Sequence, residues 1–399
     1  MGSENKKCLK VLMFPWLAHG HISPFIELAK KLSQRNFHCY ICSTPVNLNS
    51  IKNKIPEKYS VSIHLLEFHL PTLPELPPHY HTTSGLPLDL HPALGQAVKM
   101  AKPNFSNLVK SLQPDLLVHD IFQGWAAKVA SRHNIPSVTF MSSGATMMSY
   151  FSMAVGYMED YKNAERDADE EDEAFWGNNE IILVSSSREI EGKYMDYISE
   201  LTNKEIIPIG VLVDQDYPCN QVYDDDSEII MEWLRAKDEF STVFVSFGSE
   251  YFLNKEEIEE MAIGLELSNV KFIWVVRFPK GEEMGIEEAL PKGFIERVGD
   301  RGKIESIYYG VPIIAMPMHR DQPMNAKLVV ELGVGVEVKR DDDGKFRREE
   351  ISKVIRDVVI GESGENVRRK VGEKRESVRL RSREEVEEVA HKLAQLCVV

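Results

Sequence analysis

Short apolar runs alternate with amphipathic helical patterns along the chain, and this alternation constrains the fold more than any other feature. Near the start, the apolar run "KVLMF" is followed by the helical pattern "SPFIELAKKLSQRN" and then by a second apolar run, "HCYICST". The second half repeats this order from "STVFVSFGS" and "KFIWVVR" onward. Strands that alternate with helices are typical of βαβ units and of a parallel sheet. The sequence therefore predicts an α/β fold.

The 399 residues are enough for two such units. A polar, turn-rich stretch over residues 212–228 separates the two halves. We therefore predict a first domain over residues 1–217 and a second domain over residues 226–385.

The second half is irregular near residues 304–305. "ESIYYGVP" has the features of a helix end, with Gly310 as the cap and Pro312 beyond it. The preceding "GDRGK" cannot form the beginning of that helix, and a parallel crossover usually needs about a dozen residues or more. The sequence therefore predicts a second sheet that is shortened at this point.

Charge and cysteine content exclude several classes of protein. The net charge of −15 argues against a nucleic-acid partner. No apolar run approaches about 18 residues, so no membrane insertion is expected, and "MGSENKKCLK" lacks the apolar core of a secretory signal. Cys39 and Cys42 lie inside a strand-like segment, which favours buried thiols over a redox pair or a zinc site. We expect a cytoplasmic protein.

Two histidines, His19 and His21, follow the first predicted strand in "WLAHGHISPF". Ligands of open α/β sheets bind beyond the carboxyl ends of the strands, which is where these histidines are expected. Ser23 is a predicted N-cap, and Pro24 suits the first helical position. His21 would then lie just before a helix, where the macrodipole disfavours the imidazolium and preserves the neutral form that a general base requires.

A histidine base also needs a partner that fixes its tautomer. Asp120 ends the apolar run "DLLVHD" and is expected at the same rim, whereas Asp115 begins that run and is expected at the opposite edge. A functional His21–Asp120 pair is one hypothesis, and a rim histidine satisfied by backbone and water is the other. His19 is a weaker candidate for the same role.

The second half also places polar groups at strand ends. Gly248 and Ser249 end "STVFVSFGS", where a backbone N–H and a hydroxyl can contact a phosphate, although Gly-Ser is also an ordinary turn. Asp321 and Gln322 follow "VPIIAMPM", and a carboxylate with an amide suits the hydroxyls of a sugar. Capping of the next helix by Asp321 is an equally good interpretation. The absence of a G-x-G-x-x-G motif argues against a nicotinamide dehydrogenase.

Four stretches resemble, in order, the plant UDP-dependent glycosyltransferases of family 1: "FPWLAHGHISPFIELAKKL", "DLLVHDIFQGWAAKVASRHNIPSV", "STVFVSFGS" and "GVPIIAMPMHRDQPMNAKLV". The resemblance covers nearly the whole chain. "HLPTLPELPPHYHTTSGLP", "SSREIEGKYMDY" and "FGSEYFLNKEEIEE" resemble the branch that glycosylates the sugar of an existing flavonoid, terpenoid or lignan glycoside. The family implies a GT-B fold, with two facing Rossmann-like domains and a last helix, here residues 386–399, that returns to the first domain.

The resemblance also implies roles in the first domain. His21 matches the catalytic base of the family, Asp120 matches the aspartate that pairs with it, and His19 has no role. Trp16 and Phe122 adjoin these positions and are the expected acceptor contacts. The implied reaction is an inverting single displacement, without a metal, from a UDP-sugar to a small glycoside. Glucose is the expected sugar and rhamnose the alternative, and the protein is expected to be a monomer.

In the second domain the resemblance implies the donor contacts. Ser249, with Gly248 beside it, matches a phosphate contact, and Glu305 matches a ribose contact. Asp321 and Gln322 match contacts to the sugar hydroxyls.

This chain departs from the family pattern before Glu305. The family carries a Trp-Ala-Pro-Gln segment and a His-Cys-Gly-Trp segment there, whereas "GDRGKI" runs directly into Glu305. About 30 residues, the size of a βαβ unit, are absent. Either the natural protein carries this segment or it is truncated. In the second case the alternative function is an impaired transferase that binds only the acceptor glycoside.

Overall fold

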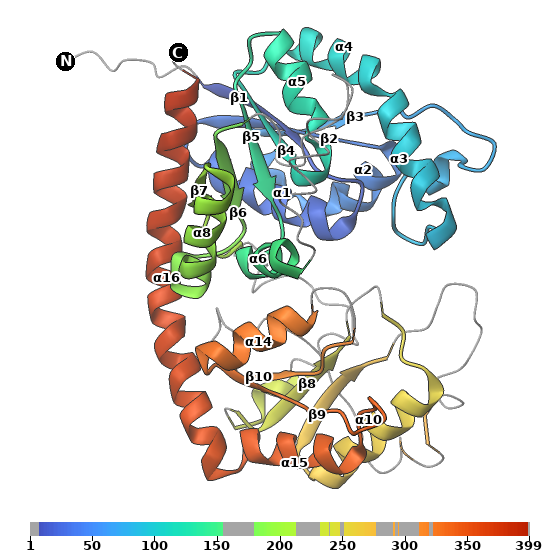
Figure 1. Cartoon of the computed structure of the whole chain (residues 1–399), viewed down its shortest axis with the longest axis vertical. Helices are drawn as coiled ribbons and strands as arrows, with labels where there is room; N and C mark the ends of the chain where they lie inside the picture. Colours follow the sequence, from blue (N-terminus) through green and yellow to red (C-terminus); the bar gives the residue numbers. More distant parts are fainter. Residues whose placement is uncertain are drawn as a thin grey trace. The chain divides into compact units, whose positions relative to one another are not determined.

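A computed structural model describes residues 8–154, 179–212, 232–238, 240–247, 251–276, 290–291, 294, 311–318 and 322–397. The chain divides into two compact units (Figure 1). The first unit combines Met1–Asp216 with Leu380–Val399, and the second unit is Tyr217–Arg379.

The first unit is built on a seven-stranded sheet. Its strands are β1 (Leu9–Phe14), β2 (Phe37–Ser43), β3 (Ile63–Glu67), β4 (Leu116–Asp120), β5 (Ser137–Met141), β6 (Ile181–Val184) and β7 (Glu205–Pro208). Its helices are α1 (His19–Ser33), α2 (Pro45–Ile51), α3 (His91–Met100), α4 (Lys102–Leu112), α5 (Trp125–Arg132), α6 (Ala145–Ala154) and α8 (Arg188–Thr202).

The seven strands are all parallel and lie in the order β3-β2-β1-β4-β5-β6-β7. The order therefore runs outward in both directions from the neighbouring strands β1 and β4. In a doubly wound sheet this reversal point opens a crevice at the carboxyl ends of the two strands, and that crevice is where ligands bind.

Strand alternation distributes the core of the first unit over both faces of the sheet. Val11 and Met13 of β1 pack with α1 on one face, whereas Leu12 and Phe14 pack with α3, α4 and α5 on the other (Figure 1). Both sets are fully buried, as expected for a parallel sheet covered by helices on both faces.

The same alternation places Cys39 and Cys42 on opposite faces of the sheet. Cys39 belongs to the core on the α1 face and Cys42 to the core on the opposite face, and both are free thiols. Burial raises the pKa of both thiols. The prediction of buried thiols is confirmed.

The second unit contains β8 (Thr242–Ser246), α10 (Lys255–Ser268), β9 (Lys271–Val275), β10 (Ile313–Ala315), α14 (Gln322–Leu332), β11 (Gly335–Glu337) and α15 (Arg348–Val359). Within its described residues, β8 pairs with β9 and β10 pairs with β11, both in parallel, so two sheets of two strands are present. One core cluster joins β8, β9, β10, β11, α10 and α15, and it contains Val245, Phe272 and Ile351.

Helix α16 (Glu362–Leu396) contributes residues to both units. Its last turns belong to the first unit, where Val389 and Leu393 are buried in the core on the α1 face. Ion pairs of Arg35 with Glu387 and of Lys392 with Glu205 add contacts around these turns. The chain end is thus part of the N-terminal unit, although a long stretch of sequence separates them.

Candidate active site

His21 lies in the first turn of α1, directly beyond the end of β1. The predicted helix start was wrong: the N-cap is Ala18, not Ser23, and Pro24 is inside the helix. The backbone N–H groups of His21 and Ile22 both donate to the Ala18 carbonyl oxygen, at 3.0 and 2.9 Å, so the first turn forms before Ser23 is reached.

A distant loop explains this early start. The Leu17 carbonyl accepts hydrogen bonds from the Thr83 backbone N–H at 2.9 Å and from the Thr82 hydroxyl at 3.4 Å. These contacts hold the chain where it leaves β1. Pro24 lacks the N–H that would bond to the Gly20 carbonyl, so one helical hydrogen bond is lost within α1.

The structure brings His21 and Asp120 together at the carboxyl ends of β1 and β4. His21 Nδ1 lies 2.8 Å from Asp120 Oδ2, and the other carboxylate oxygen accepts the Phe122 N–H at 3.0 Å. Asp120 is fully buried, whereas 23% of the His21 side chain is exposed. An ionised carboxylate can only accept, so Nδ1 carries the hydrogen and the lone pair remains on Nε2.

Ser142 is a third residue of this site, and the sequence analysis missed it. Its hydroxyl oxygen lies 3.0 Å from His21 Nδ1, on the chain segment that directly follows β5. Strand β5 neighbours β4 in the sheet, so Ser142 leaves the sheet at the same edge as Asp120. The rule that placed Asp120 could have found Ser142, because "TFMSS" also ends an apolar run with polar residues.

Beneath Asp120, a buried polar network fixes the backbone of β4. His119 Nδ1 donates to the Asp120 carbonyl at 2.9 Å, and the Asn179 side-chain amide lies 2.7 Å from His119 Nε2. Burial lowers the pKa of the His119 imidazole to about 4, so His119 stays neutral near pH 7.

Aromatic rings adjoin the histidine. The Phe122 ring centroid lies 5.4 Å from the His21 ring and 6.1 Å from the Trp16 ring, and Phe122 is 50% exposed. An exposed aromatic ring beside a candidate base can hold an apolar or ring-shaped ligand. His19 is directed elsewhere, with Nε2 3.4 Å from the Ser50 hydroxyl.

The predicted donor contacts are placed only in part. Gly248, Ser249, Glu305 and Asp321 lie outside the described residues, as does the predicted helix end before Gly310. Gln322 is the first residue of α14, and its side-chain oxygen accepts the Met318 N–H at 2.8 Å.

The described residues contain no group of three or more His, Cys, Asp or Glu side chains that could hold a metal ion. No described helix has both the length and the apolar character needed to cross a bilayer.

Comparison with known proteins identifies the family. Residues 7–212 match the family "Glycosyltransferase, N-terminal domain", and residues 207–369 match "UDP-glucoronosyl and UDP-glucosyl transferase". The chain is 47% identical to beta-D-glucosyl crocetin beta-1,6-glucosyltransferase of Gardenia jasminoides, over 96% of this chain and 98% of that protein. The chain belongs to the plant family 1 UDP-dependent glycosyltransferases. The predicted family is thereby confirmed.

Other relatives of this glycosyltransferase are similar over comparable lengths. Mogroside IIIx synthase of Siraitia grosvenorii is 45% identical, over 97% of this chain and 93% of its own. Flavanone 7-O-glucoside 2''-O-beta-L-rhamnosyltransferase of Citrus maxima is 38% identical, over 99% of both.

Solved structures confirm the predicted GT-B fold of this glycosyltransferase. Glycyrrhiza uralensis UGT73P12, complexed with glycyrrhetinic acid 3-O-monoglucuronide, has a TM-score of 0.77 at 20% identity and covers 97% of this chain and 96% of its own. Arabidopsis thaliana UGT89C1 complexed with UDP has a TM-score of 0.74 at 21% identity, over 98% of this chain and all of its own.

The glycosyltransferase lacks residues that its relative has. The alignment with the Gardenia protein extends over 437 positions, whereas this chain has 399 residues. At least 38 positions, the difference between these numbers, therefore hold no residue of this chain. The Gardenia protein has residues at these positions, inside the aligned region that spans 98% of its length. Their assignment to the region before Glu305 stays a prediction from the sequence.

Proposed function

We propose that this glycosyltransferase transfers a sugar from a UDP-sugar to a sugar hydroxyl of a small glycoside, with inversion at the anomeric carbon. The observation that carries the mechanism is the hydrogen bond between His21 and Asp120 at the reversal point of the sheet. It directs the Nε2 lone pair of a partly exposed imidazole away from the buried carboxylate.

In the proposed reaction, His21 Nε2 takes the proton of the acceptor hydroxyl while that oxygen attacks the anomeric carbon. The bond from the anomeric carbon to UDP breaks in the same step, and UDP leaves with the electron pair. Asp120 stabilises the imidazolium that forms, as a buried carboxylate does in other histidine-base sites. No metal takes part in this proposal, and backbone amides at helix starts would hold the diphosphate.

The proposed acceptor is a flavonoid or terpenoid molecule that already carries a sugar. Relatives named for glucosyl crocetin, flavanone 7-O-glucoside and cyanidin-3-O-glucoside support this class. Trp16 and Phe122 would contact the acceptor beside His21. Glucose is the proposed sugar, and the rhamnosyl transferase among the relatives keeps UDP-rhamnose as the alternative donor. We further propose a cytoplasmic monomer.

A second function is favoured by the absent residues. At least 38 aligned positions are lacking, and the donor site of this family was predicted to depend on the segment before Glu305. A chain with an intact first unit and a weakened donor site would bind the acceptor glycoside without transferring sugar to it.

Two measurements separate these functions. The first is calorimetric titration of the chain with UDP, in which undetectable binding would favour the acceptor-binding function. The second is a product assay with UDP-glucose or UDP-rhamnose and a panel of flavonoid and triterpenoid glucosides, in which an extended glycoside is the expected product.

Variants of the two histidines test the base. His21→Ala is expected to reduce turnover about 10²–10⁴-fold, the range for loss of a general base. His19→Ala is the matched control, two residues away, and should change turnover no more than a few-fold. Turnover in His21→Ala close to that of the unaltered chain would rule out the proposed base.

A further inference from the structure

The Nδ1 atom of His21 has two oxygen neighbours, and the proposed reaction gives a role to only one of them. Asp120 Oδ2 lies 2.8 Å away, and the Ser142 hydroxyl oxygen lies 3.0 Å away. The two oxygens come from the carboxyl ends of the neighbouring strands β4 and β5. The hydroxyl therefore contacts the same ring nitrogen whose hydrogen the carboxylate fixes.

The carboxylate decides how the hydroxyl contacts this nitrogen. Ionised Asp120 can only accept, so Nδ1 carries the hydrogen and cannot accept the Ser142 O–H. The Ser142 oxygen is then a second acceptor, and one N–H is shared between two oxygens, as in other three-centre hydrogen bonds. Because the imidazole ring is rigid, acceptors on two strands fix the direction of Nδ1 and with it the direction of the Nε2 lone pair.

The turn that carries Ser142 is anchored at both ends. Strand β5 ends at Met141 and helix α6 begins at Ala145, so residues 142–144 form the whole connection. Met141 and Ala145 are fully buried in one core cluster, together with Met195 and Ile198 of α8. A connection this short, with both ends buried, gives the Ser142 hydroxyl a fixed place beside His21.

A buried carboxylate from α8 caps the helix that follows this turn. Gly144 precedes α6 and has no side chain that could accept the first N–H groups of the helix. Glu191 Oε1 accepts the Thr146 N–H instead, at 2.8 Å. Glu191 is only 3% exposed, and its negative charge lies at the positive end of the α6 macrodipole, where it is stabilised.

The same carboxylate lies directly against the backbone of the turn. A Cβ added to Gly144 would lie 2.5 Å from Glu191 Oε1 and 2.7 Å from Oε2, so a larger residue does not fit there. Glu191 has non-helical dihedral angles inside α8, with φ −127° and ψ 18°. The two helices thus meet at this side chain, which ties the turn of Ser142 to α8.

We propose that Ser142 is a positioning residue for His21 and that Glu191 holds Ser142 in place. The inference rests on the proposed function, in which His21 Nε2 takes the proton of the acceptor hydroxyl. During that step the Nδ1 hydrogen stays shared between Asp120 and Ser142, and both oxygens stabilise the imidazolium. Ser142 itself neither gives nor takes a proton.

Variants of the hydroxyl are the first test. Ser142→Ala should lower kcat about 10–100-fold, because a displacement of about 1 Å in a catalytic group can cost about 10²-fold, and the acceptor KM should change no more than a few-fold. Ser142→Thr keeps the hydroxyl and should retain kcat within a few-fold. Ser143→Ala removes the next hydroxyl of the same turn and is the matched control. An unchanged kcat in Ser142→Ala, or equal losses in Ser142→Ala and Ser142→Thr, would overturn the proposal.

Nuclear magnetic resonance tests the contact without turnover. The ring N–H signal of His21 is assigned by its loss in His21→Ala. In Ser142→Ala this hydrogen should exchange with water about tenfold faster, the effect expected for roughly one lost hydrogen bond, whereas Ser142→Thr should keep the slow exchange. Equal exchange rates in Ser142→Ala and the unaltered chain would contradict the shared hydrogen bond.

Variants of Glu191 test the second part. Glu191→Met fills similar space without an oxygen and should lower kcat about tenfold, whereas Glu191→Gln keeps an acceptor for the Thr146 N–H and should lower it less. In the Ser142→Ala background, Glu191→Met should add no more than a few-fold loss, because it acts through Ser142. Fully additive losses would show that Glu191 only supports the fold. Glu189→Ala, at an exposed carboxylate two residues earlier, is the matched control.

Glu191→Ala replaces Glu191→Met if the longer side chain prevents folding, and exchange of the Thr146 amide then reports loss of the cap. The two proposals can fail separately. Turnover that survives His21→Ala would remove the base. Ring N–H exchange that is equal in all variants would remove the role of Ser142, and this measurement needs neither UDP nor an acceptor.

Discussion

The two units have the same alternating sequence pattern but differ in how completely their sheets are built. In the first unit, seven parallel strands form one sheet, and every residue of β4 is buried. In the second unit, the described strands form two pairs, and no residue of β10 is fully buried. Parallel sheets are stable when covered on both faces and paired at both edges of each central strand. The apolar pattern of one strand therefore ensures burial only when its neighbours are present.

The difference also separates the two halves of the proposed chemistry. The His21–Asp120 pair, with Ser142, is assembled entirely within the first unit, at the carboxyl ends of the neighbouring strands β1, β4 and β5. Of the predicted donor contacts, only Gln322 lies in the described part of the second unit, where its side-chain oxygen accepts the Met318 N–H. The proposed acceptor activation would thus rest on one continuous sheet, and the proposed donor binding on a unit whose described strands form two separate pairs.

The largest expected effect tests whether the first unit works as a catalytic half. Asp120→Asn should lower kcat about 10²–10⁴-fold, because an amide can stabilise the wrong histidine tautomer and cannot stabilise the imidazolium. Asp115→Asn is the matched control, at the other end of the same strand, where the carboxylate accepts the Lys10 N–H. In steady-state kinetics, the kcat of this control should stay within a few-fold of the kcat of the unaltered chain. Similar losses in both variants would indicate a folding defect.

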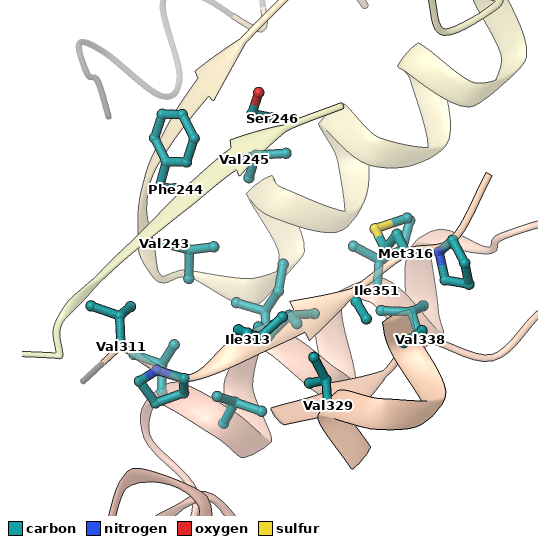
Figure 2. A pocket seen from close by; sticks show the side chains of 18 of the residues that line it. Val243, Phe244, Val245, Ser246, Val311, Ile313, Met316, Val329, Val338 and Ile351 are labelled. Atoms are coloured by element: carbon teal, nitrogen blue, oxygen red, sulfur yellow. The ribbon is translucent and has the colours of Figure 1, made fainter. Parts of the chain in front are cut away.

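A pair of core truncations compares the two sheets directly. Ile41→Ala, at a fully buried residue of β2, should cost about 2–5 kcal/mol, through lost burial and a new cavity. Ile313→Ala in β10 should cost less than half as much, because this side chain is half-buried and already lines a cavity (Figure 2). Urea unfolding followed by hydrogen exchange reports each unit separately. Equal costs would mean that the sheet of the second unit is as well packed as the first.

Two glycines compare helix packing in the units. Gly264→Ala in α10 should destabilise the second unit by about 1–3 kcal/mol, because the new Cβ would lie 2.8 Å from Ile351 Cγ2 of α15. Gly95→Ala in α3 should stabilise the first unit by about 0.5–1 kcal/mol, because no atom lies within 4 Å of its Cβ. Thermal unfolding of both variants checks the opposite signs. A tolerated Gly264→Ala would show that α10 and α15 can move apart.

The smallest effects concern pH, where two carboxylates should act in opposite directions. In the second unit, hydrogen bonds from Arg348 hold the pKa of Glu260 below its usual value. The stability gained is present above the unfolded pKa of about 4.3 and is lost as pH falls through the lower folded pKa. The measurement is urea unfolding at a series of acid pH values. Glu260→Gln should remove this loss of stability at low pH.

In the first unit, burial raises the pKa of Glu385, against the opposing effects of the Arg188 N–H, the Ser187 hydroxyl and Arg381. Its contribution to stability is fully present below the unfolded pKa and is lost as pH rises through the higher folded pKa. As the pH falls from neutral through the raised folded pKa toward the unfolded pKa of about 4.3, the first unit should therefore gain stability from this group. Glu385→Gln should flatten that gain, and an unchanged slope would show that Glu385 ionises normally.

The sequence alone determined features that depend on short-range chemistry. The alternation of apolar runs was enough to predict a parallel α/β fold, and "NKEE" specified the start of α10. There Asn254 and Glu257 form reciprocal capping hydrogen bonds of 3.0 and 2.9 Å. The approximate place of His21 and Asp120 followed from the rule that ligands bind at the carboxyl ends of strands.

Tertiary structure decided features that depend on residues far apart in the sequence. Helix α1 begins at His19, because Thr82 and Thr83 hold the Leu17 carbonyl across more than 60 residues. Ser142 joins His21 only because β5 lies beside β4 in the sheet. Local patterns specify which segments become strands and helices, whereas hydrogen bonds between distant segments decide which of them meet.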